Sequence, residues 1–132
     1  MLMKRFIFAV LCSICILVFA ACGKKADPIA LPCADDITSV DITADGSTVS
    51  YSDKTWICNI ISDISAAEPA GKESVQDTPQ TENYIRIVLN TTTGAGTTLY
   101  VYEDTCGFYI EQPYQGIYKT DSELYERLHI QK

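Results

Sequence analysis

An Asp-Gly pair between two stretches of alternating apolar and polar residues limits the possible folds of this chain more than any other pattern. Asp45 and Gly46 tolerate the positive φ angles of a type I′ turn, which joins two antiparallel strands through a two-residue loop. The pair therefore predicts a hairpin over 37–51. Apolar residues then share one face, so the turn and the alternation predict the same register. The predicted partners are Ala44 with Ser47, Ile42 with Val49, Val40 with Tyr51, Asp41 with Ser50, and Thr43 with Thr48.

A helix is expected directly after this hairpin. Ser52 or Asp53 can accept hydrogen bonds from its first amides, and five large apolar residues follow at helical spacing, which predicts a face that packs on a sheet. Cys58 lies off this apolar stripe. Residues 66–83 contain two prolines and a glycine among polar residues and are predicted to form a long surface loop. The stripe consists of Trp56, Ile57, Ile60, Ile61 and Ile64.

The second half of the chain predicts further strands and a second helix. Alternation predicts strands over 84–90, 98–103 and 108–112, with a short strand at 117–119 left open. Residues 120–123, Thr-Asp-Ser-Glu, match a capping box and predict that a short helix begins there. The resulting order ββαβββα indicates an α+β fold. We expect an antiparallel sheet of about five strands with one or two helices packed on one face.

The N-terminus has the three parts of a secretion signal. Lys4 and Arg5 supply the basic start, residues 6–19 are almost entirely apolar, and Ala20 and Ala21 are the small residues at the exit. A membrane-spanning helix needs about 20 apolar residues to cross roughly 30 Å of hydrocarbon. The apolar run is shorter than this, so a cleaved signal is favoured over a transmembrane segment.

The end of this signal resembles the bacterial lipobox, in which a bulky apolar residue and two small residues precede the cysteine that receives the lipid. Phe19 stands where Leu is usual, and Cys22 stands at the cysteine position. Cleavage by an ordinary signal peptidase fits less well, because Phe19 or Val18 would occupy a position that prefers a small residue. We expect residues 1–21 to be removed and Cys22 to carry diacylglycerol and a further acyl chain such as palmitate, because a single chain binds only reversibly.

The remaining chain divides into a spacer and a domain. Residues 22–36 contain few large apolar residues and are expected to be a flexible spacer. Residues 37–132 are expected to form a single small extracytoplasmic domain. Loss of Lys4 and Arg5 with the signal leaves 17 Asp and Glu against eight Lys and Arg, so the net charge falls from −7 to −9. Such acidity argues against nucleic acid and anionic lipid headgroups as partners, so the lipid and not surface charge is expected to hold the protein at the membrane.

Neither metal nor cofactor binding is expected. Three cysteines remain after cleavage and lipidation, namely Cys33, Cys58 and Cys106. They can form one disulfide or stay as three free thiols, and the sequence does not decide between these alternatives. These cysteines are too widely spaced for a typical zinc site. His129, the single histidine, has no ligand partner at a suitable spacing and is interpreted as a surface residue at a helix end.

Catalytic patterns are equally absent from the sequence, and we expect that the protein is not an enzyme. There is no Gly-x-Ser-x-Gly motif, and a Ser-His-Asp arrangement would have to recruit His129 from the last few residues. The acidic pairs at 35–36 and 103–104 are of a type that can act on a sugar. In so acidic a domain, however, they are better interpreted as solvated surface residues.

Six tyrosines at or near strand positions opposite the aliphatic ones are the candidate binding residues. If the helices cover the aliphatic face, these rings line the open face of the sheet. A tyrosine ring offers flat apolar area with a polar tip, which suits a glycan or an envelope protein. The alternatives are that the rings stabilise a half-exposed sheet or pack beneath the long loop. The six are Tyr84, Tyr100, Tyr102, Tyr109, Tyr114 and Tyr118.

Three stretches of the chain resemble a family of uncharacterised bacterial domains. They are residues 109–118 (Tyr-Ile-Glu-Gln-Pro-Tyr-Gln-Gly-Ile-Tyr), 67–69 (Ala-Glu-Pro) and 73–77 (Glu-Ser-Val-Gln-Asp). Domains of that family occur in short lipoproteins, mostly of low-GC Gram-positive bacteria, and the similarity extends over about 37–128. The resemblance implies a domain that works outside the cell. It implies no chemistry, because the family has no assigned function or catalytic residues.

Three functional hypotheses are compatible with these patterns. The first is a non-enzymatic, membrane-anchored binding or sensing module that uses the tyrosine-rich face or the segment 113–118. The second is a small cell-envelope hydrolase, which requires a concave pocket with carboxylates of shifted pKa. The third is a stoichiometric protein inhibitor, which predicts complex formation without turnover.

Overall fold

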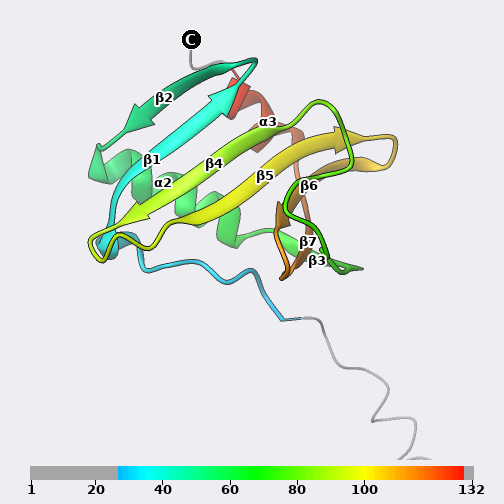
Figure 1. Cartoon of the computed structure of the whole chain (residues 1–132), viewed down its shortest axis with the longest axis horizontal. Coiled ribbons are helices and arrows are strands. Elements are labelled where there is room, and N and C mark those ends of the chain that lie inside the picture. The colour runs from blue at the N-terminus through cyan, green and yellow to red at the C-terminus, as the bar shows by residue number, and fades with distance from the viewer. Residues whose placement is uncertain (1–26, 130–132) are drawn as a thin grey trace, which may run out of the picture.

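The predicted hairpin is present in the structure, a computed structural model that describes residues 27–129 (Figure 1). β1 (Ile37–Ala44) and β2 (Ser47–Tyr51) pair antiparallel, and every predicted partner faces its predicted residue. Asp45 has a φ of 51° and Gly46 a φ of 77°, as a type I′ turn requires. The register inferred from turn and alternation is therefore confirmed.

The hairpin forms one edge of an antiparallel sheet of seven strands in the order β2-β1-β4-β5-β6-β7-β3. The α+β class is confirmed, but the predicted count of about five strands is too low and the predicted order is incomplete. Both additional strands lie where the sequence left a loop or an open choice. The strands beyond the hairpin are β3 (Glu68–Lys72), β4 (Ile85–Thr91), β5 (Thr97–Asp104), β6 (Gly107–Gln112) and β7 (Gly116–Thr120).

β3 is the strand that the sequence assigned to a loop. Its residues, Glu-Pro-Ala-Gly-Lys, include the two types that most often interrupt a strand. Proline is tolerated here because β3 is an edge strand that pairs only with β7, so one side of its backbone needs no partner. The register shifts between Pro69 and Lys72, and Gly71 has a φ of 71°. An irregular edge strand of this kind leaves no alternating pattern in the sequence.

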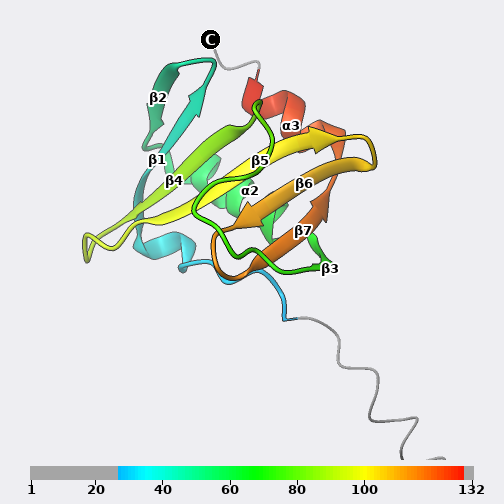
Figure 2. The ribbon, with the colours of Figure 1, turned by 45° about the vertical axis from the view of Figure 1, so that its right-hand side comes forward.

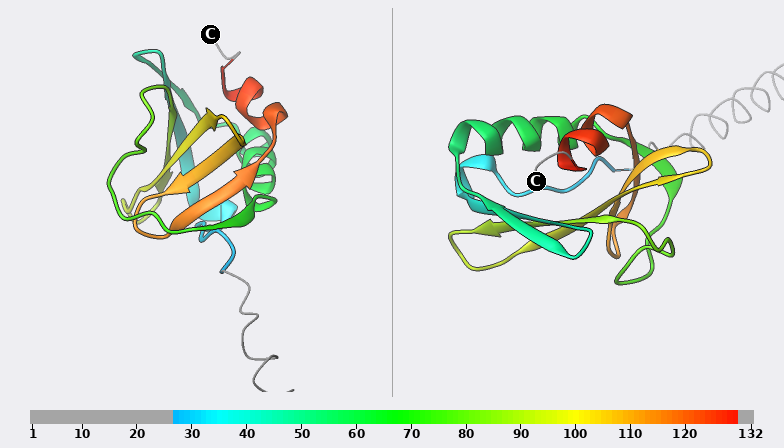
Figure 3. Two further views of the ribbon diagram at one scale, coloured as in Figure 1. Left: turned by 90° about the vertical axis from the view of Figure 1, so that its right-hand side faces the viewer. Right: turned by 90° about the horizontal axis from the view of Figure 1, so that it is seen from above.

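Two helices cover one face of the sheet, α2 (Lys54–Ser65) and α3 (Ser122–His129), as the sequence predicts (Figure 3). Asp53 caps α2, because its Oδ1 accepts a hydrogen bond from the backbone amide of Trp56 at 2.8 Å. Of the two caps proposed from sequence, Asp53 rather than Ser52 is therefore correct. Within residues 27–129, neither helix is long and apolar enough to cross a membrane.

The start of α3 differs by one residue from the expectation. The backbone amide of Leu124 donates to Oδ1 of Asp121 at 3.0 Å, so Asp121 and not Thr120 is the cap. Thr120 is the last residue of β7. The capping-box pattern therefore identified the helix but not its capping residue, because β7 continues through the position where the pattern begins.

The core lies between the helices and the aliphatic face of the sheet. The α2 residues that the sequence assigned to the stripe are buried, except Trp56, which is partly buried and stacks on Tyr51 with ring centroids 4.2 Å apart. An ion pair between Arg127 and Asp63 joins the two helices at the surface. The most deeply buried residues on the sheet are Ile37, Val40, Ile85, Ile87, Leu89, Leu99, Val101 and Ile110.

The part of the predicted spacer that the structure describes packs on the domain. Ile29 is 8% exposed and belongs to the core, and Nε2 of Gln112 donates to the carbonyl oxygen of Ala30 at 2.8 Å. A short 3-10 helix, η1 (Ala34–Asp36), then leads into β1. The fold therefore begins before Ile37, where the sequence placed its first residue.

The cap of α2 gives a direct test of the helix start. Asp53→Ala removes the carboxylate that accepts from the Trp56 amide, and we expect the free energy of unfolding to fall by about 1 kcal/mol. Urea unfolding measures this change. Ser52→Ala is the matched control and should change stability by less than about 0.5 kcal/mol. Equal losses in the two variants would contradict the assignment of the cap.

Candidate functional site

The tyrosines that the sequence proposed as a binding face do not lie together on an open surface. Tyr100, Tyr102 and Tyr109 lie on the sheet face opposite the helices, but their side chains are buried, with 6%, 8% and 7% exposed. Only Tyr84 and Tyr114 are exposed, at 36% and 62%. The expectation of an open tyrosine-lined face is therefore wrong for the central three rings.

Residues 73–84, which connect β3 to β4 and are called the strap below, pass over the face of β5 and β6 on which these tyrosines lie (Figure 2). Oγ of Ser74 donates to Oε1 of Glu111 at 2.6 Å, and both groups are buried. At the end of the strap, the ring of Tyr84 meets that of Tyr100 edge to face at 5.0 Å. The alternative that the tyrosines pack beneath the long loop is the arrangement found.

Tyr118 lies on the other face of the sheet. It pairs with Ile110 across β6 and β7, and residues that face each other in an antiparallel pair share a face. Its ring therefore belongs to the core beneath the helices, where it is 5% exposed. The sequence placed Tyr118 with the other tyrosines because the register of β7 could not be counted across the turn at Pro113.

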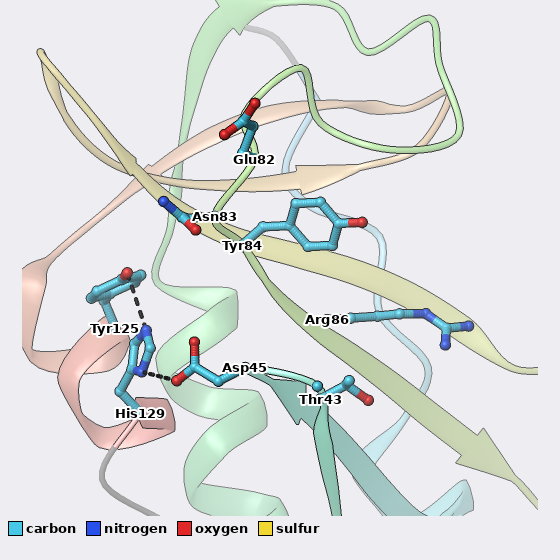
Figure 4. A pocket seen from close by; sticks show the side chains of 9 residues that line it. Thr43, Asp45, Glu82, Asn83, Tyr84, Arg86, Tyr125 and His129 are labelled. Atoms are coloured by element: carbon cyan, nitrogen blue, oxygen red, sulfur yellow. Dashed lines mark hydrogen bonds and ion pairs between the residues drawn. The ribbon is translucent and has the colours of Figure 1, made fainter.

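A concave site with exposed polar groups lies at another place, at the turn of the β1–β2 hairpin. This cavity of about 450 Å³ is formed by the hairpin turn, the end of the strap and the last turn of α3 (Figure 4). We call it the hairpin pocket. It combines acidic, basic, hydroxyl and aromatic groups within one concave surface. Its lining residues are Thr43, Asp45, Gly46, Glu82, Asn83, Tyr84, Arg86, Tyr125 and His129.

His129 is the centre of one wall of the hairpin pocket. Its Nε2 lies 3.1 Å from the hydroxyl of Tyr125, and its Nδ1 lies 3.9 Å from Oδ2 of Asp45. Figure 4 shows Asp45 and Tyr125 pointing toward the imidazole, whereas Tyr84 and Arg86 extend away from it. The wall therefore presents a carboxylate, an imidazole and a phenol hydroxyl side by side, to which a ligand can hydrogen-bond.

Arg86 supplies positive charge on the opposite side of the hairpin pocket. It lies on β4 opposite Thr43, on the sheet face that does not carry the helices. Among residues 27–129, Arg86 has no carboxylate within ion-pair distance. Hydrogen bonds from Ser50 and Asn90 lower the pKa of Asp41, and the charge of Arg86 adds a smaller effect in the same direction. The guanidinium thus remains available for an anionic group of a ligand.

No sequence pattern indicates the hairpin pocket. The sequence predicts a surface position at a helix end for His129 and a turn position for Asp45. Both statements describe their local positions correctly, since His129 ends α3 and Asp45 is in the turn. The two side chains meet because α3 packs beside the hairpin, and this packing leaves no pattern in the spacing of residues.

The cysteine and metal expectations can be compared with the described part of the chain. Cys33, Cys58 and Cys106 are exposed, and none of them forms a disulfide. Within residues 27–129, no three His, Cys, Asp or Glu side chains are grouped closely enough to hold a metal ion. Cys22 and the signal at 1–21 lie outside the described residues.

Comparison with known proteins assigns the chain to a family. Residues 25–119 match DUF5301, a family described as a domain of unknown function (DUF5300). The chain belongs to this family. The match begins at Lys25, which agrees with the packing of Ile29 in the core and with a fold that starts before β1. A comparison with curated proteins gave no match.

A solved relative has the same fold. The DUF5301 domain described here is similar to a protein from Ruminococcus gnavus whose structure was determined by NMR, with a TM-score of 0.64 and 33% sequence identity. The similarity covers 72% of this chain and 93% of the other. At this level of identity and coverage, the antiparallel sheet with its helices is a shared property.

Because the tyrosines beneath the strap are buried as neutral phenols, we expect the domain to lose stability at high pH. Burial, together with the nearby Glu111 carboxylate, raises the pKa of Tyr102 to about 12. Below its ordinary pKa of about 10 the phenol is neutral in both states and stability is unaffected, whereas above it only the unfolded chain loses the proton. We therefore expect the free energy of unfolding to fall as the pH rises from about 10 to about 12.

Tyr102→Phe should make this fall shallower, as measured by urea unfolding at a series of pH values. The control is Asp53→Ala, which lowers stability without removing a phenol and should keep the slope of the parent protein. An unchanged slope in Tyr102→Phe would contradict the role assigned to this ring.

Proposed function

We propose that this DUF5301 protein is a lipoprotein, anchored through Cys22 on the extracytoplasmic face of the membrane, and that its domain is a non-enzymatic binding module. The anchor is supported by the basic start, the apolar run and the Phe-Ala-Ala-Cys segment of the sequence. The observation that carries the binding role is the hairpin pocket. It is a concave site whose carboxylates and guanidinium lie on different sides.

The ligand that fits this arrangement carries both charges. Asp45 and Glu82 suit an ammonium group, and Arg86 suits a carboxylate, which it can bind through two parallel hydrogen bonds. The ring of Tyr125, which lies beside the imidazole of His129, offers flat apolar area to the ligand. A short peptide with a free amino end and a free carboxyl end has these features. A cavity of about 450 Å³ is within the range of small-molecule sites.

A small envelope hydrolase is the second candidate. It is favoured by the concave shape of the hairpin pocket and by the placement of a carboxylate beside an imidazole, Asp45 with His129. Such a pair is the orienting part of several hydrolytic sites, but the lining residues include no serine or cysteine as nucleophile. Release of product from the same peptides would favour this candidate over simple binding.

The anchor is tested by the mass of the mature protein. The wild-type protein, expressed in a bacterial host and extracted from its membranes, should begin at Cys22 and carry the mass of diacylglycerol and acyl chains. Cys22→Ala should lack that mass. Cys33→Ala, which changes an exposed cysteine of the domain, is the control and should keep the lipid. A mature N-terminus elsewhere would overturn the anchor.

The hairpin pocket is tested on protein that lacks residues 1–21 and carries Cys22→Ala, so that no lipid is attached. Trialanine is titrated into this protein in a calorimeter. Arg86→Ala should weaken binding about tenfold or more, because a hydrogen-bonded charge pair contributes about 1.5–3 kcal/mol. Arg127→Ala removes an exposed guanidinium outside the pocket and is the matched control. Equal effects of the two variants, or no binding of trialanine, would contradict the proposed ligand class.

A further inference from the structure

The described chain begins at one end of the domain, and the hairpin pocket lies at the other. Asp27 and Pro28 line a cavity together with residues of β3 and β7, such as Pro69 and Ile117. The hairpin turn and the end of α3 lie at the opposite end of the sheet (Figures 1 and 2). We call the end that contains residues 27–30, β3 and the β6–β7 turn the proximal end.

Only a short stretch of chain separates the proximal end from the anchor. Ile29 is held in the core, so the chain is fixed to the domain from about that residue onward. Seven residues lead from Cys22 to Ile29, and even fully extended they span at most about 25 Å. A lipid on Cys22 would therefore keep the proximal end close to the bilayer. The spacer predicted from sequence, residues 22–36, is about twice as long and would not.

The turn between β6 and β7 places an exposed tyrosine at this end. The amide of Gln115 donates to the carbonyl oxygen of Gln112 at 3.0 Å, which closes a turn with Pro113 and Tyr114 at its centre. Tyr114 has a φ of 60°, a strained conformation that usually selects glycine or asparagine at this position of a turn. Its side chain is nevertheless the most exposed of the aromatic rings noted above, at 62%.

The strap supports this exposed ring and adds an apolar neighbour. The hydroxyl of Tyr114 donates to Oδ1 of Asp77 at 2.8 Å. Val75, two residues earlier in the strap, is 74% exposed. The proximal end therefore presents a ring with a polar tip and an aliphatic side chain to solvent. Tyrosine of this kind is enriched where proteins meet the membrane–water interface.

We propose that the proximal end rests on the membrane, with the ring of Tyr114 and the side chain of Val75 in the interfacial layer of the bilayer that holds Cys22. This inference rests on the lipid anchor of the proposed function. Two exposed apolar groups bind a bilayer weakly by themselves, but the short tether holds them at high local concentration. The contact is apolar and not electrostatic, because the mature chain is strongly acidic. It orients the hairpin pocket away from the membrane, toward the cell wall.

The test uses the full lipidated protein in phosphatidylcholine vesicles whose acyl chains carry bromine, which quenches nearby tryptophan. Tyr114→Trp should lose roughly half of its added emission to the quencher. Tyr84→Trp is the matched control, because Tyr84 is an exposed tyrosine that lines the hairpin pocket at the other end. The emission added by Tyr84→Trp should not be quenched, and the native Trp56 signal is subtracted from both.

Two further variants are controls. One covers the case in which Tyr114→Trp does not fold, and the other shows whether quenching depends on the short tether. Val75→Trp reports on the same end from a residue without positive φ, should Tyr114→Trp fail to fold. Inserting about twelve Gly and Ser residues after Lys25 lengthens the tether and should reduce the quenching. Thermal unfolding confirms that each variant is folded.

Equal quenching of Tyr114→Trp and Tyr84→Trp would overturn the proposed orientation, as would quenching of neither. If the ring of Tyr114 is shielded from solvent in intact cells but is not quenched in pure lipid vesicles, a protein partner covers the proximal end. This result would also overturn the proposal. The intact mass of the protein distinguishes failure of the membrane contact from failure of the lipid anchor. Lipid on Cys22 without quenching rejects only the contact, whereas absence of lipid rejects both.

Discussion

Strict alternation along the central strands governs the arrangement of the domain. Because successive side chains of a strand point to opposite faces, β5 and β6 place apolar residues on one face and tyrosines with Glu111 on the other. Each face then needs its own cover. The aliphatic face is covered by α2 and α3, and the tyrosines on the other face are covered by the strap, so both faces of the central strands carry buried side chains.

The two covers differ in their chemistry, and this difference decides which polar side chains are buried. The helices bury aliphatic side chains that need no specific partners. The strap covers tyrosines and a carboxylate, which must be hydrogen-bonded when buried, and Ser74 satisfies Glu111. A surface that looks suited to ligands in the sequence is therefore used for internal packing. The two ends of the strap stay exposed, one where it meets the hairpin and α3 and the other where it contacts the β6–β7 turn.

Under the proposed lipid anchor, these two ends would have separate roles. The hairpin pocket gathers charged groups from three segments and is far from the first described residues. The other end combines the start of the domain with a strained, exposed tyrosine. Strain of this kind persists only where the surrounding structure holds it, and it is most often found at functional positions. A short tether would make the orientation of the domain part of its function.

The sequence by itself determined the hairpin and its register, the α2 stripe with two possible caps, and the α+β class. These features follow from local rules, since turn geometry and side-chain periodicity depend only on neighbouring residues. Tertiary structure decided the pairing of β3 at the sheet edge, the packing of Ile29, the burial of the central tyrosines and the meeting of Asp45 with His129. Each of these depends on contacts between segments distant in the chain, and such contacts leave no periodic trace in the order of residues.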